Sequence, residues 1–259
     1  MKLNDLSLFL LDMDGTIYFE DTLIDGAKEF IEKLISLKKP YVFLTNNSSV
    51  NKFNYLDKMK RLGILCTEDH IFSSGMATGI FLKENRQNKT VYVVGTQALK
   101  EELSNYGIRL VNEQPDIVLV GFDRELSYEK LEKACGFIDD GAEFIATNAD
   151  VLYPIKNHRF IPDCASICTM ITNATKKQPF FIGKPNPYMV DLMAKKHQVK
   201  PSQIAMVGDR LYTDIAAGKN AQAITILVLS GETSKQMLEE STIKPDFVFA
   251  SIKEIGDYL

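Results

Sequence analysis

The sequence predicts an α/β protein in which a parallel β-sheet is covered by helices on both faces. Short apolar runs that are typical of buried strands alternate along the chain with longer segments of helical periodicity. This alternation of strand and helix favours a parallel sheet. The 259 residues can bury a large core, either as one large domain or as two smaller ones, and the pattern alone does not decide between them.

The first quarter of the chain shows the alternation clearly. A buried strand is expected within residues 7–15, followed by an amphipathic helix within 25–39. The apolar face of this helix consists of Ala27, Phe30, Ile31, Leu34 and Ile35. The next strand is expected within 40–48, and the helix after it can end at Gly63.

The rest of the chain continues in the same way. Further strands are predicted within 90–95, 116–122, 143–148, 180–185, 204–209 and 223–231. Helices are predicted within 97–107 and 127–141, from near Thr213, and within 186–198, where Asn186 can cap and Pro187 can take the first helical position.

Composition excludes several classes of function. The formal net charge is −4 and no block of Lys or Arg stands out, so we expect neither nucleic acid nor a membrane surface as a partner. No apolar run approaches the length that spans a bilayer, and no secretory signal is evident. The four cysteines form no zinc-binding pattern and are expected to be reduced thiols, with Cys164 and Cys168 spaced to pack on one helical face. A cytoplasmic protein is the expectation.

Two carboxylates follow the first predicted strand. Asp12 and Asp14 come directly after Leu8 to Leu11. Residues i and i+2 of an extended chain point the same way, so both side chains can face one site. Two neighbouring carboxylates repel each other and are costly to bury unless a positive charge sits with them. The alternative is a solvated turn, since Asp and Gly are common in turns.

Three other predicted strands also end in polar residues. Thr45 and Asn46 can donate hydrogen bonds to phosphoryl oxygens, or can simply cap a turn. Lys184 follows a third strand, where a solvated lysine is the alternative. Asp209 follows a fourth, and Asp214 can be an acid that favours a helix N-terminus. If these strands are neighbours, the side chains converge on one edge of the sheet, where open parallel sheets bind ligands.

One mechanism uses all of these residues. Asp12 and Asp209, with a main-chain oxygen near Asp14, form a hard oxygen site that suits Mg²⁺. Asp12 is the best-placed nucleophile for forming an aspartyl-phosphate, and Asp14 can serve as acid and base. The transferring phosphoryl group would be held by Mg²⁺ and by the remaining polar residues, Thr45, Asn46 and Lys184.

The four clusters together resemble the motif set of the haloacid dehalogenase (HAD) superfamily. The match is "DMDGT", Thr45 in "LTNN", Lys184 in "GKPNP", and "GDRLYTD". The sequences of the last three motifs are similar to those of the p-nitrophenylphosphatase-like, nucleotidase-like branch, subfamily IIA. One such motif alone would be weak evidence, but the ordered set is specific and spans both ends of the chain.

The resemblance implies a role for each matching residue. Asp12 would be the nucleophile and Asp14 the general acid and base. Thr45 and Asn46 would bind phosphate, and Lys184 would position the phosphate and the nucleophile. For the metal, Asp12, Asp209 and the main chain at Asp14 would be ligands, and Asp214 would support them from behind.

The resemblance also implies a domain division. The core, with a Rossmann-like sheet, would consist of residues 1–76 and 179–259, and a smaller α/β cap domain would be inserted at 77–178. In the cap, the polar residues Asn148, Asp150 and His158 could face the leaving group, although a polar loop is ordinarily just solvated. This loop departs from the glycine-rich form expected of the branch, so no relative's substrate is carried over.

The expected function is therefore a Mg²⁺-dependent phosphatase of small phosphorylated metabolites, with p-nitrophenyl phosphate as an artificial substrate. Two alternatives stay open: a phosphotransferase of the same superfamily, and a phosphoacceptor signalling module that does not hydrolyse its phosphate. Signalling modules of the receiver type are normally about half this length. The sequence names neither the physiological substrate nor the oligomeric state, and a homodimer stays open.

Overall fold

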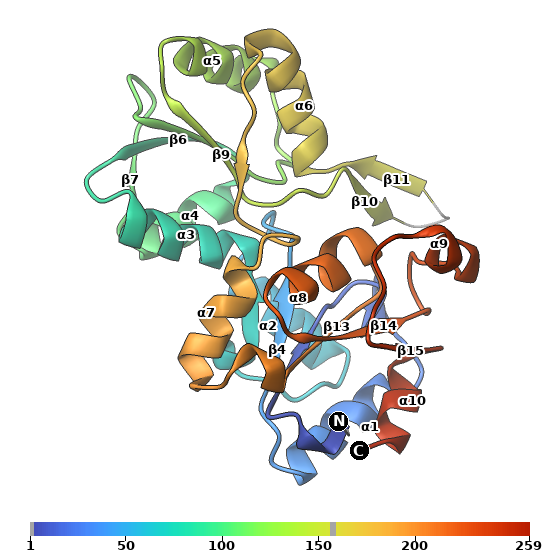
Figure 1. The fold of residues 1–259 in the computed structure, drawn as a ribbon. Coiled ribbons are helices and arrows are strands. Elements are labelled where there is room, and N and C mark those ends of the chain that lie inside the picture. Colours follow the sequence, from blue (N-terminus) through green and yellow to red (C-terminus); the bar gives the residue numbers. More distant parts are fainter. Residues whose placement is uncertain (1–2, 156–158) are drawn as a thin grey trace. The chain divides into compact units, whose positions relative to one another are not determined.

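The structure, a computed structural model, describes residues 3–155 and 159–259 and consists of two compact units (Figure 1). We name them the core unit, Met1–Thr45, Lys52–Phe72 and Lys184–Leu259, and the inserted unit, Asn46–Asn51 and Ser73–Gly183. The predicted insertion, residues 77–178, falls wholly within the inserted unit. That this unit acts as a cap stays a prediction.

The core unit is built on a six-stranded sheet of order β15-β14-β13-β1-β4-β5. The interior strand β1 (Leu8–Leu11) lies between β13 (Ile204–Gly208) and β4 (Tyr41–Thr45), and both neighbours run parallel to it. Every residue of these three strands is buried, as expected for a parallel sheet covered on both faces. The other strands are β5 (Ile71–Ser73), β14 (Ile224–Val228) and β15 (Phe247–Phe249).

All helices of the core unit except α9 (Lys235–Glu240) bury apolar residues. In α1 (Ala27–Ser36), Ala27, Phe30, Ile31 and Leu34 are buried as predicted, but Ile35 is 46% exposed. At about 100° per residue Ile35 falls at the edge of the stripe, which is narrower than predicted. The other helices are α2 (Lys52–Arg61), α7 (Tyr188–His197), α8 (Ala216–Asn220), α9 (Lys235–Glu240) and α10 (Ile252–Asp257), which packs beside α1. Short 3₁₀ turns span Leu3–Asp5, Glu68–His70 and Pro201–Gln203.

Two local features of the core unit flank the carboxyl ends of β1 and β13. After β1 the chain turns and forms a small antiparallel hairpin, β2 (Tyr18–Phe19) with β3 (Thr22–Leu23). After β13 the sequence predicts a helix from near Thr213, but the chain first makes a π-helical turn, Leu211–Ile215, which leads into α8. Single π turns occur frequently at functional sites.

The inserted unit has its own five-stranded sheet of order β12-β9-β8-β6-β7, in which all neighbours are parallel. The strands are β6 (Thr90–Val94), β7 (Arg109–Leu110), β8 (Ile117–Val120), β9 (Glu143–Ala146) and β12 (Phe180–Phe181). The helices are α3 (Ser74–Asn85), α4 (Gln97–Asn105), α5 (Tyr128–Asp139) and α6 (Cys164–Thr175), and β10 (Leu152–Ile155) pairs with β11 (Arg159–Pro162) in a hairpin.

The apolar core of this unit lies between its sheet and helices α5 and α6. Cys164 and Cys168 are buried there on one face of α6, as their spacing predicts, and all four cysteines are free thiols. The strand predicted before Lys184 corresponds to β12, which pairs with β9. It is therefore not a neighbour of β1, and only three of the four strands with polar ends share a sheet.

No helix within the described part of the chain is long and apolar enough to cross a membrane.

Candidate active site

The candidate site lies at the carboxyl edge of the core sheet, where β1, β4 and β13 end together. The amide of Asp12 continues the sheet by donating to Val207 O, at 2.8 Å. The chain then turns, and the Met13 carbonyl accepts hydrogen bonds from the amides of residues 16–18. Parallel pairing therefore fixes Asp12, and a hydrogen-bonded turn fixes Asp14.

Lys184 lies at the centre of the site, with only 1% of its surface exposed. Its ammonium donates to Asp12 Oδ1 and Asp214 Oδ1, each at 2.6 Å, and to the Leu44 carbonyl at 3.1 Å. Burial alone would lower the pKa of Lys184, but the two carboxylates raise it above its usual value. The predicted lysine is thus a buried cation between two acids and not a solvated side chain.

Three carboxylates gather around this lysine. One oxygen from each of Asp12, Asp209 and Asp214 lies within 4.8 Å of the others. Both oxygens of Asp214 are already engaged, Oδ1 by Lys184 and Oδ2 by the amide of Arg210 at 3.1 Å. Asp209 Oδ2 accepts from the Glu232 amide, whereas Asp209 Oδ1 is buried and has no hydrogen-bond partner among the described residues.

The positive charge in the site is too small for these acids. Burial and the neighbouring Asp214 raise the pKa of Asp12 well above its usual value, although Lys184 counteracts them. Burial and Asp214 also raise the pKa of Asp209, to about 7. Burial raises the pKa of Asp14, against the lowering effects of Lys58, Arg210 and Lys184. A cation that prefers hard oxygen ligands would offset the repulsion between these carboxylates. Asp209 Oδ1, which has no hydrogen-bond partner among the described residues, is an available ligand for it.

Glycines let the backbone approach Asp209 closely. Gly15 has φ +87°, and a Cβ there would lie 2.4 Å from Asp209 Oδ2. A Cβ on Gly231 would lie 1.9 Å from the same oxygen. Both positions therefore exclude any side chain as long as Asp209 keeps this orientation.

The predicted phosphate-binding pair divides between the two units. Thr45 is the last residue of β4, is buried, and belongs to the core unit. Asn46 is buried too but belongs to the inserted unit, where its carbonyl accepts from Ser74 Oγ at 2.5 Å. The structure thus brings Thr45 to the strand edge that carries Asp12, while Asn46 begins the segment that is packed with the inserted unit.

Two of the predicted specificity residues, Asn148 and Asp150, lie within the inserted unit. Asn148 and Asp150 are buried, and Asn148 Nδ2 donates to Asp150 Oδ2 at 3.1 Å and to Asp163 Oδ1 at 3.2 Å. Asp163 in turn caps α6 through the Cys164 amide. Asn148 and Asp150 therefore have structural partners. His158 lies outside the described residues.

Sequence reasoning assigned no role to several residues that contact the site. Arg210 lies inside the quoted motif "GDRLYTD", and its guanidinium pairs with Glu232 at 2.8 Å. The position of Arg210 directly after Asp209 is the sequence signal that points to it. Tyr18 is bridged to Asp14 through the backbone, and the ammonium of Lys58 lies over the Tyr18 ring; the two residues come from separate parts of the chain, with no motif to link them.

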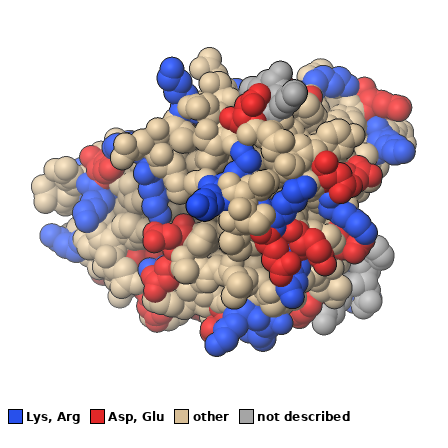
Figure 2. Space-filling view, turned by 90° about the horizontal axis from the view of Figure 1, so that it is seen from below, with Lys and Arg blue, Asp and Glu red and all other residues tan. Residues whose placement is uncertain are grey.

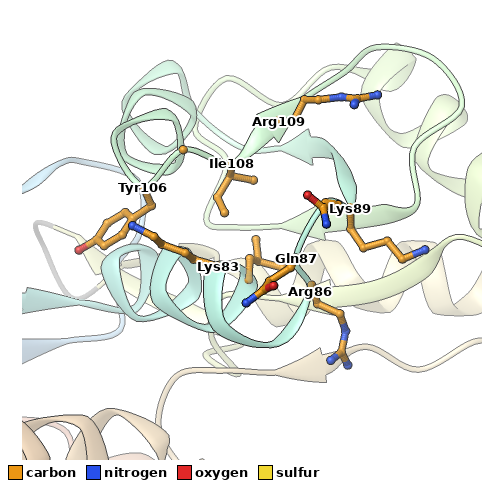
Figure 3. A pocket seen from close by; sticks show the side chains of 10 residues that line it. Lys83, Arg86, Gln87, Lys89, Tyr106, Ile108 and Arg109 are labelled. Atoms are coloured by element: carbon orange, nitrogen blue, oxygen red, sulfur yellow. The ribbon is translucent and has the colours of Figure 1, made fainter.

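A cavity of about 640 Å³ in the inserted unit is a separate feature. None of the predicted site residues that the structure describes lines it. Its cations include Arg86, held by Glu143 at 2.7 Å, and Lys89, held by Asp116 at 2.9 Å. Figure 3 shows the side chains of Lys83 and Lys89 extending in opposite directions. Their ammonium groups therefore do not converge on a single anion.

Comparison with known proteins gives the family. Residues 9–109 match the family model of haloacid dehalogenase-like hydrolases, and residues 181–255 match a second model described as HAD-hydrolase-like. An acid sugar phosphatase of Staphylococcus saprophyticus is 36% identical over 248 residues, which cover 95% of each chain. The chain belongs to the haloacid dehalogenase-like hydrolases. The resemblance inferred from the four motifs is thereby confirmed.

Other relatives place this hydrolase within the family. The 5'-nucleotidase YutF of Bacillus subtilis is 34% identical, with 97% of this chain and 98% of the relative covered. The crystal structure of a 4-nitrophenylphosphatase from Thermotoga maritima superposes with a TM-score of 0.95 at 41% identity, covering 98% of each chain. The hydrolase therefore belongs to the p-nitrophenylphosphatase-like branch, subfamily IIA, and has the fold of that branch.

Proposed function

We propose that this hydrolase is a phosphatase that cleaves small phosphate monoesters through an aspartyl-phosphate on Asp12. The observation that carries the proposal is the arrangement at the end of β1, where Asp12 Oδ1 is held by the buried Lys184 beside the unpartnered Asp209 Oδ1. The phosphatase and nucleotidase names of the relatives support the same reaction class.

The first half-reaction uses the two carboxylates after β1. The Asp12 carboxylate attacks phosphorus, a new bond forms between an Asp12 oxygen and phosphorus, and the bond from phosphorus to the leaving oxygen breaks. Asp14, whose pKa burial raises, gives its proton to that leaving oxygen. Lys184 and Thr45 would hold the phosphoryl oxygens and offset their charge, and Asn46 is proposed to join them.

The second half-reaction returns the enzyme to its starting state. Asp14, now a carboxylate, takes a proton from water while the water oxygen attacks phosphorus. The bond between phosphorus and Asp12 breaks, inorganic phosphate leaves, and Asp14 is again protonated. The Lys184 hydrogen bond holds Asp12 in one orientation through both steps.

The donor set fits Mg²⁺. We propose that Asp12, Asp209 and a main-chain oxygen at Asp14 hold the ion, because Asp209 Oδ1 is a buried carboxylate oxygen with no partner among the described residues. Asp214, with both oxygens engaged, would orient Lys184 and the Arg210 amide. When bound, Mg²⁺ would supply positive charge that stabilises the transferring phosphoryl group.

The proposed substrates are small phosphorylated metabolites, including nucleotides and sugar phosphates, with p-nitrophenyl phosphate as an artificial substrate. Acidic and basic side chains are interspersed on the face that Figure 2 draws, which gives no broad cationic surface for a nucleic acid. We place the enzyme in the cytoplasm, since its four free thiols suit a reducing compartment. We also propose that the inserted unit selects the leaving group through Asn148, Asp150 and His158. A homodimer is a further proposal.

A panel of phosphorylated metabolites assayed with Mg²⁺ tests the function, with Asp12→Asn as the blank. We expect phosphate release by the wild type and a loss of at least about a thousandfold in Asp12→Asn, because an amide cannot form the acyl phosphate. Unchanged circular dichroism would show that the variant folds. Activity retained in a folded Asp12→Asn would overturn the nucleophile, and a phosphorylated acceptor in place of free phosphate would indicate a phosphotransferase.

A further inference from the structure

Lys58 and Tyr18 contact each other next to the turn that carries Asp14. The ammonium of Lys58, from α2, lies 3.7 Å from the centroid of the Tyr18 ring. The Tyr18 side chain is fully buried, and Lys58 is half-buried. A cation centred over a buried aromatic ring is attracted by the negative face of its π system.

Tyr18 is part of the backbone frame that sets the position of Asp14. The backbones of Asp14 and Tyr18 form a β-bridge, and the Gly15 amide donates to the Tyr18 carbonyl at 2.8 Å. The Tyr18 amide in turn donates to the Met13 carbonyl at 3.2 Å. A movement of the Tyr18 ring would therefore be transmitted through β2 to the residue before Asp14 and to the residue after it.

Lys58 differs from an ordinary surface lysine on the same helix. Within the described residues, no carboxylate oxygen comes within ion-pair distance of its ammonium, so the ring is its specific contact. Burial lowers the pKa of Lys58, and Asp14 is the charge that most counteracts this effect. Two residues further along α2, Lys60 is exposed and provides a natural comparison.

We propose that Lys58 is a positioning residue for Asp14, which it acts on by holding the Tyr18 ring and, with it, the turn that presents the Asp14 carboxylate. This inference rests on the proposed function, in which Asp14 protonates the leaving oxygen. Lys58 itself touches neither the phosphoryl group nor the nucleophile in this assignment.

The proposal has a signature that a purely structural role lacks. Proton transfer from Asp14 matters most when the leaving oxygen is a poor leaving group, as in an alkyl phosphate. It matters little for p-nitrophenolate, which departs readily without a proton. A misplaced Asp14 therefore slows the cleavage of alkyl esters selectively, whereas general damage to the site slows both esters alike.

The test measures kcat/KM of Lys58→Met for an alkyl phosphate and for p-nitrophenyl phosphate, with Mg²⁺ present. We expect the ratio of the two values to shift against the alkyl ester by about tenfold, a fraction of what a complete general acid contributes. Lys58→Arg, which keeps a cation over the ring, should restore the ratio. Lys60→Met is the matched control and should leave both values unchanged, and Asp14→Asn should show the same selectivity more strongly.

Equal losses on both esters in Lys58→Met, or a ratio that Lys58→Arg does not restore, would overturn the inference while leaving the proposed function intact. Tyr18→Leu provides a second route, because it removes the ring but keeps the cation, and a folded Tyr18→Leu must show the same selective loss. A wild type that cleaves neither ester would overturn the proposed function, and the inference with it.

Discussion

Lys184 provides one positive charge between two buried carboxylates, Asp12 and Asp214. Its substitution by Met would leave both acids buried without a cation. We expect Lys184→Met to lose about 3–5 kcal/mol of unfolding free energy at pH 8, the usual cost of removing one member of a buried pair. The loss should be smaller at pH 5, because burial raises the pKa of Asp12 and favours its protonated form there. Denaturant unfolding at both pH values measures the difference.

Lys195→Met is the control for this prediction, since Lys195 is an exposed residue of α7. Its effect on stability should be within about 0.5 kcal/mol. If Lys184→Met unfolded at the same denaturant concentration as the control, Lys184 would not be the counter-charge of these acids.

Among single residues, the sequence predicts those that directly follow strands and misses those that only the fold brings close to the site. Asp12 and Asp209 can be recognised because each ends an apolar run at the edge where ligands bind. Lys58 cannot, because it lies within a helix and meets Tyr18 across the fold. For Asn148 and Asp150, a polar stretch in the sequence does not reveal that the side chains are buried and bonded to each other.

Among the elements, the two sheets use the same device to align neighbouring strands. In the core unit, the Asp246 carboxylate accepts from the amide and hydroxyl of Thr225, at 2.8 and 2.7 Å, and the Asp246 amide donates back to the hydroxyl. In the inserted unit, Asp116 and Thr90 make the same three contacts. A lysine adds an ion pair in each case. The Asp before one strand is thus tied to a Thr at the start of its neighbour.

Asp246→Ala should therefore loosen the edge of the core sheet. We expect the free energy of unfolding to fall by about 1 kcal/mol at pH 7. This is less than the sum of the contacts that Asp246 makes, because its carboxylate is partly exposed. Burial alone would raise the pKa of Asp246, but the bonds from Lys219 and Thr225 lower it. A lowered pKa gives stability above the unfolded pKa near 4, so the loss should shrink as the pH falls below that value.

Urea unfolding at pH 7 and at pH 3 checks this prediction, with Glu239→Ala on the exposed face of α9 as the control. A destabilisation that is as large at pH 3 as at pH 7 would contradict the role of the charged carboxylate.

Elements could be predicted wherever periodicity is strong. The buried strands β1, β4 and β13 and helix α1 follow directly from their apolar patterns. The partner of a strand is not encoded in its pattern, and so β12 could not be assigned to the second sheet before pairing was seen. The π turn Leu211–Ile215 was missed because it differs from an α-helix in one hydrogen-bond register and not in composition.

Across the whole molecule, the proposed Mg²⁺ would link stability to pH. Asp209 has a folded-state pKa of about 7, and that of Asp12 is also raised, so the metal-free folded state retains protons that the unfolded state loses near pH 4. These two groups therefore make the metal-free protein less stable as the pH rises from about 4 to 7. Because the proposed Mg²⁺ would compensate the ionised carboxylates, we expect it to raise Tm more at pH 7.5 than at pH 5.

Thermal unfolding with EDTA and with Mg²⁺ at the two pH values measures this difference, and the comparison cancels the other titrating groups. Asp209→Asn should lose most of the Mg²⁺-dependent shift. An equal shift at pH 5 and pH 7.5, or phosphatase activity that persists in EDTA, would contradict the metal assignment.

The division of the molecule into two units could not be predicted from pattern alone. No Pro-, Gly- or Ser-rich linker marks a boundary, because the chain passes between the units at the end of β4, at the start of α2, within β5 and shortly after β12. Resemblance to the family predicts an insertion at 77–178, whereas the short segment Asn46–Asn51, which packs with the inserted unit, has no signal in the sequence.

Because Lys184 is buried, its chemical labelling would report whether the structure around it has opened. Reagents that acylate amines need an exposed, unprotonated lysine, and Lys184 is 1% exposed with a raised pKa. Exposed lysines such as Lys195 should be labelled in the native protein, whereas Lys184 should be labelled when a molecule opens. Mass spectrometry of the peptide that contains Lys184 would therefore count the opened molecules in a sample, with no need for a substrate.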